Sequence, residues 1–365
     1  MKASLLFLLV FVSYATACAI QDTSLHEVPQ IFYKNGAPVI KWVEAGEVKE
    51  LSKEQSVSFD SDVKQLGSRY GIPLEEAFAA GINMNDAVDN EQSYQGVNRW
   101  LAISDIHGQY DLFVSLLRVH GVIDHANNWN FAEGHLVING DILDRGEGTT
   151  EALWLVFKLQ QQAAEQGGMV HYNMGNHELM VLAGDVRYIH KKYDAIGQLL
   201  NEKYDEQFSQ DTFFGRWIRQ RTALVNINDV GFVHGGISPD LVQSGLRPSD
   251  INALFADSIL NHAKDVYSQS ERLSLLTTTQ GPVWYRGFLN DEQLTETDLD
   301  SIVNWWGVKR IVVGHTTQRE VRALFGGRAL AIDAGIKDGK TGQVLIFDQG
   351  ELFRGMLDGS RQRLL

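Results

Sequence analysis

The chain has 365 residues, of which 44% are hydrophobic and 21% charged, the composition of a globular protein long enough for one large domain or two ordinary ones. Its formal net charge is -14 at pH 7, and this acidic excess argues against nucleic acid and anionic lipid as main partners. Cys18 is the only cysteine, which excludes an internal disulfide and a cysteine nucleophile in the body of the chain.

The first twenty residues have the pattern of a secretory signal peptide. A single lysine precedes an unbroken apolar run at 5–12, and the small residues at 15–17 form an A-x-A cleavage pattern. The run is too short for a permanent membrane span. We therefore predict export, to the periplasm or out of the cell, with residues 1–20 as the signal. A lipid anchor on Cys18 is disfavoured, because Ala15 stands where a lipobox has a bulky aliphatic residue.

Residues 21–97 are predicted to form a β-rich N-terminal extension. Residues 31–43 indicate a hairpin, because the Asn-Gly pair at 35–36 readily adopts the positive φ angles of a tight turn. The alternating pattern continues at 47–51, and a short helix is expected near 62–70. This segment contains no recognisable catalytic grouping.

Residues 98–355 are predicted to form an α/β catalytic domain. Short apolar runs, typical of buried strands, each end in a polar, glycine-containing turn; they lie at 100–103, 136–138, 170–174, 231–233 and 310–313. Amphipathic stretches at 111–119 and 149–166 indicate helices between strands. In such a protein the functional residues gather at the strand ends. The aromatic-rich segment 185–221 indicates either a cap beside the site or ordinary helices with buried aromatic residues.

The turns after these strands carry side chains that can bind metal ions. Together they supply two carboxylates, one amide oxygen and three imidazoles, from Asp105, His107, Asp141, Asn176, His234 and His315. This mixture of oxygen and nitrogen ligands favours first-row divalent ions such as Mn, Fe or Zn over calcium. An aspartate that bridges two ions, as we expect for Asp141, would hold them roughly 3.5–4 Å apart, the spacing of a two-metal hydrolytic site.

Further charged side chains accompany these candidate ligands. Arg145 and Arg286 carry guanidinium groups that match the oxygens of a phosphoryl group. His177 is placed to protonate a leaving oxygen, and Asp144 would hold its ring in the required tautomer. In this interpretation a metal-bridging hydroxide attacks phosphorus directly, without a phosphoenzyme. We interpret the remaining histidines as surface residues, packing residues or supports of the site: His26, His120, His125, His135, His171, His190 and His262.

The order of these motifs resembles the phosphoprotein phosphatase superfamily of metallophosphoesterases, whose pattern is GDxHG, GDxxDRG, GNHE, HGG and GH. The chain has SDIHG, GDILDRG, GNHE, HGG and GHT, so Ser104 replaces the opening glycine. Residues 331–335 stand where eukaryotic serine/threonine phosphatases have a SAPNY-type element. GDVRY at 184–188 and GPVWYR at 281–286 make the chain more similar to the Shewanella-like branch of the superfamily.

The resemblance implies a metallophosphoesterase-type α/β/β/α sandwich and hydrolysis of phosphomonoesters on proteins or peptides, with phosphotyrosine as the leading substrate. One alternative is a dinucleoside polyphosphate hydrolase, nucleotidase or other small-phosphoester phosphatase on the same scaffold. Asp144 argues against it, because the polyphosphatase relatives tend to have Asn there. A second alternative is a catalytically inactive phosphate-binding surface protein. The complete ligand set argues against that, because a protein drifting away from catalysis usually loses a ligand first.

Overall fold

The computed structural model describes residues 23–83, 88, 90–264, 271–290 and 294–365. The predicted signal peptide lies outside the described residues, so export stays a prediction. The helices are α1 (Phe59–Tyr70), α2 (Leu74–Ala80), α3 (Tyr110–Val119), α4 (Thr149–Glu165), α5 (Asn176–Leu182), α6 (Lys191–Leu200), α7 (Phe213–Arg219), α8 (Pro239–Gln243), α9 (Pro248–Leu254), α10 (Glu271–Thr277) and α11 (Glu296–Trp306). The strands are β1 (Glu27–Lys34), β2 (Ala37–Glu44), β3 (Glu47–Ser52), β4 (Ser93–Tyr94), β5 (Arg99–Ile103), β6 (His135–Ile138), β7 (Met169–Tyr172), β8 (Leu224–Ile227), β9 (Val230–Val233), β10 (Arg310–Val313), β11 (Arg322–Leu324), β12 (Ala329–Ala331), β13 (Gln343–Asp348), β14 (Glu351–Met356) and β15 (Arg361–Arg363).

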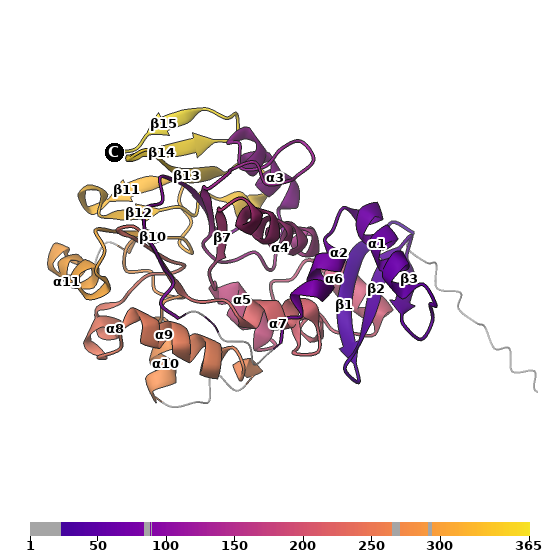
Figure 1. Ribbon diagram of the computed structural model, residues 1–365. Coiled ribbons are helices and arrows are strands. Elements are labelled where there is room, and N and C mark those ends of the chain that lie inside the picture. Colours follow the sequence, from indigo (N-terminus) through magenta and orange to yellow (C-terminus); the bar gives the residue numbers. More distant parts are fainter. Residues whose placement is uncertain (1–22, 84–87, 89, 265–270, 291–293) are drawn as a thin grey trace, which may run out of the picture.

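The N-terminal elements form a small sheet with two helices at one end of the molecule (Figure 1). Strands β1, β2 and β3 are antiparallel, and Asn35 and Gly36 have φ angles of 50° and 80° in the predicted hairpin turn. The hairpin and helix α1 are confirmed. The indole nitrogen of Trp154 on α4 donates a hydrogen bond to the carbonyl oxygen of Pro29 at 2.8 Å. The extension therefore packs on the helices that follow it.

Two six-stranded sheets form the centre of the molecule, in the orders β15-β14-β13-β5-β6-β7 and β11-β12-β10-β9-β8-β4. Alternate residues of β5 face opposite layers, as the period of a strand requires. Trp100 meets Phe232 of β9 in the second sheet with ring centroids 5.1 Å apart, whereas Leu101 and Ile103 belong to the core shared with α3 and α4. On β10, Val312 faces the sheet interface in the same way. This is the α/β/β/α sandwich that the resemblance implied.

The carboxyl ends of the central strands meet at one edge of the sandwich. Strands β5, β6 and β7 are parallel, and so are β9 and β10. Ile103 pairs with Ile138, so the turns after β5 and β6 begin at the same level. The side-chain amide of Asn139 donates to the carbonyl oxygen of Val233 at 2.9 Å and thereby joins the two sheets at this edge. Loops from both sheets consequently converge there.

The aromatic-rich segment 185–221 is mostly ordinary helical structure. Helices α6 and α7 and the segment that joins them bury the aromatic side chains Tyr193, Tyr204, Phe208, Phe213, Phe214 and Trp217. Tyr188 is the exception, because it is 41% exposed. Across the described ranges, no helix has the length and apolar character that a membrane crossing requires.

Candidate metal centre

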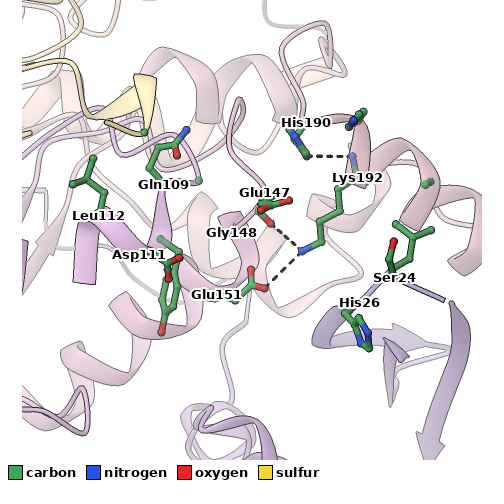
Figure 2. A pocket seen from close by; sticks show the side chains of 16 residues that line it. Ser24, His26, Gln109, Asp111, Leu112, Glu147, Gly148, Glu151, His190 and Lys192 are labelled. Atoms are coloured by element: carbon green, nitrogen blue, oxygen red, sulfur yellow. Dashed lines mark hydrogen bonds and ion pairs between the residues drawn. The ribbon is translucent and has the colours of Figure 1, made fainter. Parts of the chain in front are cut away.

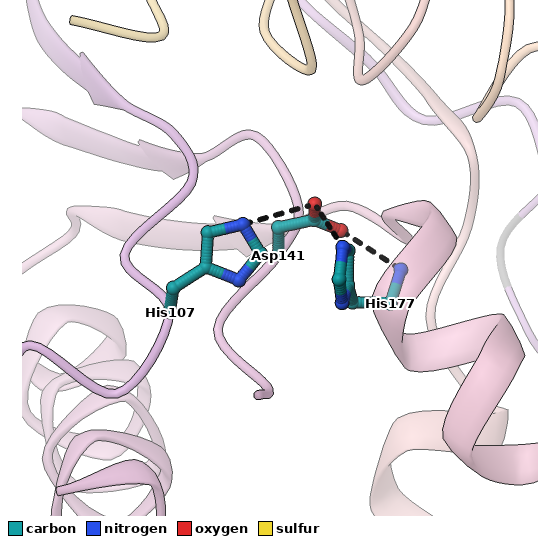
Figure 3. A group of neighbouring side chains, drawn as sticks. All are labelled: His107, Asp141 and His177. Carbon is teal, nitrogen blue, oxygen red and sulfur yellow. Dashed lines mark hydrogen bonds and ion pairs between the residues drawn. The ribbon is translucent and has the colours of Figure 1, made fainter. Parts of the chain in front are cut away.

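Asp141 lies at the centre of the converging loops. Its Oδ2 is 3.5 Å from Nε2 of His107, 3.3 Å from Nε2 of His234 and 3.9 Å from Nε2 of His177. Figure 3 shows the carboxylate between His107 and His177. Two groups of buried side chains have geometry that could hold a metal ion: His107, Asp141 and His177, and Asp141, His234 and His315. Asp141 belongs to both groups, as a bridging ligand must.

The histidines present the nitrogen that a metal would need. Nδ1 of His107 lies 2.8 Å from the carbonyl oxygen of Leu143, and Nδ1 of His234 lies 2.8 Å from that of Asn139. Because a carbonyl only accepts, each Nδ1 carries a proton, and each Nε2 is the nitrogen that faces Asp141. Nε2 of His315 is buried and has no hydrogen-bond partner within the described ranges. These buried imidazole nitrogens are ligand atoms of the kind that first-row divalent ions take.

Asp105 and Asn176 each lie beside one of the two groups. Oδ1 of Asp105 is 3.9 Å from Nε2 of His107. Its Oδ2 accepts hydrogen bonds from the hydroxyl of Ser104 at 2.6 Å and from the backbone N–H of His315 at 3.0 Å. Oδ1 of Asn176 is 3.1 Å from Nε2 of His234. The structure thus brings all six predicted ligands together.

Burial and neighbouring charges shift the pKa values of several side chains at this centre. Burial raises the pKa of Asp105 to about 8, and the nearby carboxylates of Asp333 and Asp141 add to this. Burial also opposes ionisation of Asp141, but the His234 and His177 imidazoles hold its pKa well below the usual range. Burial lowers the pKa of His107 to about 3. Burial opposes protonation of His234, but the Asp141 carboxylate raises its pKa to about 10. Buried carboxylates that repel one another are stabilised by cations close to them.

The backbone at these residues is unusually strained. Positive φ angles, which L-residues other than Asn and Gly rarely adopt, occur at Asp105 (55°), His107 (48°), Asp141 (60°), Asp144 (72°), Arg145 (67°) and His315 (61°). Each such residue costs of order 1–3 kcal/mol and persists only where its surroundings enforce it. Six of the fifteen non-glycine residues with positive φ in the described part of the chain are predicted site residues, and backbone strain of this kind clusters at functional sites.

The predicted proton donor and its partner are in contact. Nδ1 of His177 is 2.6 Å from Oδ2 of Asp144, and both side chains are buried. Burial lowers the pKa of His177, but the carboxylates of Asp141 and Asp144 outweigh it and leave the pKa raised. A protonated His177 is therefore favoured. Its Nε2 also lies within reach of the His107 and Asp141 group, so distance alone permits it to act as a metal ligand.

The two predicted arginines lie at the rim. Arg286 is exposed and donates from Nη1 to the carbonyl oxygen of His315 at 2.8 Å and to the hydroxyl of Thr316 at 3.2 Å. Arg145 is also exposed, and its guanidinium carbon lies 5.1 Å from the centroid of the Tyr188 ring. Exposed cations beside a buried acidic centre are suitably placed to bind an anion.

Sequence reasoning missed Glu178, although it is the last residue of the GNHE motif. Its buried carboxylate accepts hydrogen bonds from the backbone N–H groups of Asp141 at 2.9 Å, Ile142 at 2.8 Å and Gly175 at 2.9 Å. It therefore ties the loop after β6 to the start of α5. Gly175 completes this contact, because a Cβ there would lie 2.1 Å from Oδ1 of Asp141. The GNHE motif could have pointed to Glu178, but only its hydrogen bonds show that it holds the loop after β6.

A separate cavity of about 820 Å³ lies between the N-terminal extension and the loops that follow His107 and Arg145 (Figure 2). Its lining includes His26 from the extension, Glu147, and Lys192 of α6. Nζ of Lys192 lies 2.8 Å from Oε2 of Glu27 and 3.7 Å from Oε1 of Glu151. None of the predicted site residues lines this cavity. The volume of a cavity is therefore no guide to the position of the candidate metal centre.

Comparisons with known proteins agree with this geometry. Residues 99–319 match the calcineurin-like phosphoesterase family. The chain is 28% identical to Shewanella-like protein phosphatase 1 of Plasmodium berghei, over 65% of this chain and 66% of the relative. It is 24% identical to Shewanella-like protein phosphatase 2 of Arabidopsis thaliana, over 67% of this chain and 73% of the relative. The crystal structure of a cold-active protein-tyrosine phosphatase from a psychrophilic Shewanella species superposes with a TM-score of 0.79 and 35% identity, over 93% of this chain and 99% of that one.

The family match spans the converging loops from the turn after β5 to the turn after β10. The family uses divalent metal ions, and the described residues include two groups that could bind them. The chain therefore belongs to the calcineurin-like phosphoesterase family and, within it, to the Shewanella-like branch of the phosphoprotein phosphatases.

Proposed function

We propose that this protein is a metal-dependent phosphoprotein phosphatase that hydrolyses phosphomonoesters by direct attack of water, with phosphotyrosine as its main substrate. The observation that carries the proposal is the position of Asp141, which belongs to both groups of potential metal ligands. One ion would be held by Asp105, His107 and Asp141, and the other by Asp141, Asn176, His234 and His315.

The metal ions, when bound, lower the pKa of a coordinated water and polarise the phosphoryl oxygens. The protein side chains do the remaining work. Arg145 and Arg286 neutralise the phosphate from two different loops at the rim. His177 donates a proton from Nε2 to the leaving oxygen, while Asp144 keeps the ring oriented through Nδ1 at 2.6 Å.

The choice of substrate rests on the relatives. Two of them are protein phosphatases by name, and the structurally similar Shewanella enzyme is a protein-tyrosine phosphatase. A phosphorylated side chain on a protein surface can reach exposed arginines such as Arg145 and Arg286 without entering a closed cavity. These features support a phosphoprotein substrate and, more specifically, phosphotyrosine.

Metal removal tests the core of the proposal. Treatment with a chelator is expected to abolish hydrolysis of an aryl phosphate, and a divalent transition metal should restore it, because the ions activate the attacking water. Thiol alkylation is the matched control and should have no effect, because Cys18 is the only cysteine. Full activity in protein shown by elemental analysis to be free of metal would contradict the two-metal mechanism.

Peptide substrates test the finer proposal. On peptides of matched sequence, kcat/KM is expected to be about tenfold higher for phosphotyrosine than for phosphoserine or phosphothreonine, the scale of one well-placed aromatic contact. Steady-state rates with a single defined metal would measure the ratio. Faster hydrolysis of the phosphoserine peptide would refute the phosphotyrosine preference and leave the phosphatase assignment intact.

A further inference from the structure

Tyr188 is an exposed aromatic residue beside the candidate metal centre. It lies in the loop between α5 and α6 and is 41% exposed, and no other aromatic side chain in the described part of the chain is as exposed. The neighbouring aromatic residues of segment 185–221 are buried. Tyr188 therefore lies outside the core of this segment, and an amphipathic aromatic ring at such an exposed position can pack against a ligand.

The ring of Tyr188 touches residues with two different proposed roles. Its centroid lies 5.3 Å from that of the His177 ring, at an interplanar angle of 51°. The backbone carbonyl oxygen of Tyr188 accepts a hydrogen bond from the backbone N–H of Arg145 at 2.9 Å. Tyr188 thus contacts the proposed proton donor, His177, through its side chain and the proposed phosphate-binding residue, Arg145, through its backbone.

Two guanidinium groups hold the ring in place. The guanidinium carbons of Arg145 and Arg187 lie 5.1 Å and 5.6 Å from its centroid, within the range of cation–π attraction. Arg187 is in turn paired with Asp185, with Nη2 to Oδ2 at 2.5 Å. These contacts favour one orientation of the ring, which reduces the entropy lost when a ligand packs against it.

The position of His177 determines which part of the substrate would meet this ring. A proton donor must come within about 2.6–3.2 Å of the leaving oxygen. The carbon bonded to that oxygen then lies next to His177 and consequently next to Tyr188. In phosphotyrosine this carbon belongs to a phenyl ring, whereas in phosphoserine it is a methylene group with little surface to bury.

We propose that Tyr188 is the wall of the leaving-group subsite, packs against the aryl ring of the substrate, and is the residue that favours aryl over alkyl phosphoesters. This inference rests on the proposed phosphatase function and names the structural origin of its specificity. Aromatic pairs of this kind prefer offset or edge-to-face packing with centroids about 4.5–7 Å apart.

The test compares Tyr188→Ala with Tyr188→Phe on matched phosphotyrosine and phosphoserine peptides. In Tyr188→Ala the ratio of kcat/KM for the two peptides is expected to fall by about threefold to tenfold, because the aromatic contact is lost. Tyr188→Phe keeps the ring and should keep the ratio. Inhibition by inorganic phosphate, which lacks a leaving group, should change by less than about twofold in both variants.

An unchanged ratio in Tyr188→Ala would overturn the proposal. If the unchanged ratio comes with equal losses on both peptides and weaker phosphate inhibition, Tyr188 acts only by positioning Arg145. Failure of the unaltered protein to hydrolyse either peptide would instead refute the proposed function. Metal content and circular dichroism of each variant would show that the comparison is between folded, metal-loaded proteins.

Discussion

Replacing Asp141 with Asn is expected to remove bound metal and to lower phosphatase activity by at least about a thousandfold, roughly 4 kcal/mol of transition-state stabilisation. Asp141 is the one side chain shared by both groups of potential ligands. An amide has no charge and binds metal through a single oxygen, so it cannot replace a bridging carboxylate. Elemental analysis of the purified variant would measure the metal, and an aryl phosphate assay would measure the rate.

Arg145→Ala is the matched control for this experiment. It removes an exposed cation at the rim while leaving every proposed ligand in place. We expect full metal content and a loss of about 2–4 kcal/mol in transition-state stabilisation, the scale of one preorganised electrostatic contact. Equal loss of metal in both variants would show that the roles of ligand and phosphate clamp have been confused.

His177→Asn is expected to keep both metal ions and to lose activity in a way that depends on the leaving group. The loss should be about 10²–10⁴-fold for an alkyl ester such as phosphoserine, smaller for phosphotyrosine, and least for nitrophenyl phosphate, because a stable anion departs without a proton. The motivation is the contact of 2.6 Å between Nδ1 of His177 and Asp144, which supports a protonated ring. Rates on the three esters, with metal content determined in parallel, would check this.

Asp144→Asn provides the companion variant. Its amide can still contact His177 but cannot stabilise a positive ring, so the same order of leaving groups is expected with a smaller loss. Two results would contradict the assignment. Loss of metal from His177→Asn would make His177 a ligand, as its place in the group with His107 and Asp141 permits. A uniform loss on all three esters with metal intact would make it a phosphate-binding residue.

The candidate site was predictable because its residues follow a simple local rule. Buried strands are short apolar runs, and Asp105, Asp141 and His234 each come directly after or within a few residues of such a run. Parallel strands place their carboxyl ends at one edge, so distant residues could be grouped before any contact was known. The hairpin at Asn35 and Gly36 was predictable for a similar reason, since its turn depends on neighbouring residues alone.

Other features depend on contacts between distant residues and have no local signal. Composition could not predict that Phe213 and Trp217 are buried whereas Tyr188 is exposed. Aromatic side chains occur both in cores and at surfaces. Glu178 is one of many glutamates at the start of a helix, and only its hydrogen bonds to the loop after β6 distinguish it.

Residue type and local spacing were enough to predict the strand-and-turn order, the candidate metal ligands, the proton donor and the cationic side chains. The contacts of the folded chain were needed to see that Glu178 fixes the loop of Asp141 and that Tyr188 lies beside His177. The physical reason is that distances between loops are determined by how two sheets pack on each other, through contacts such as that of Trp100 with Phe232, and no stretch of sequence contains that packing.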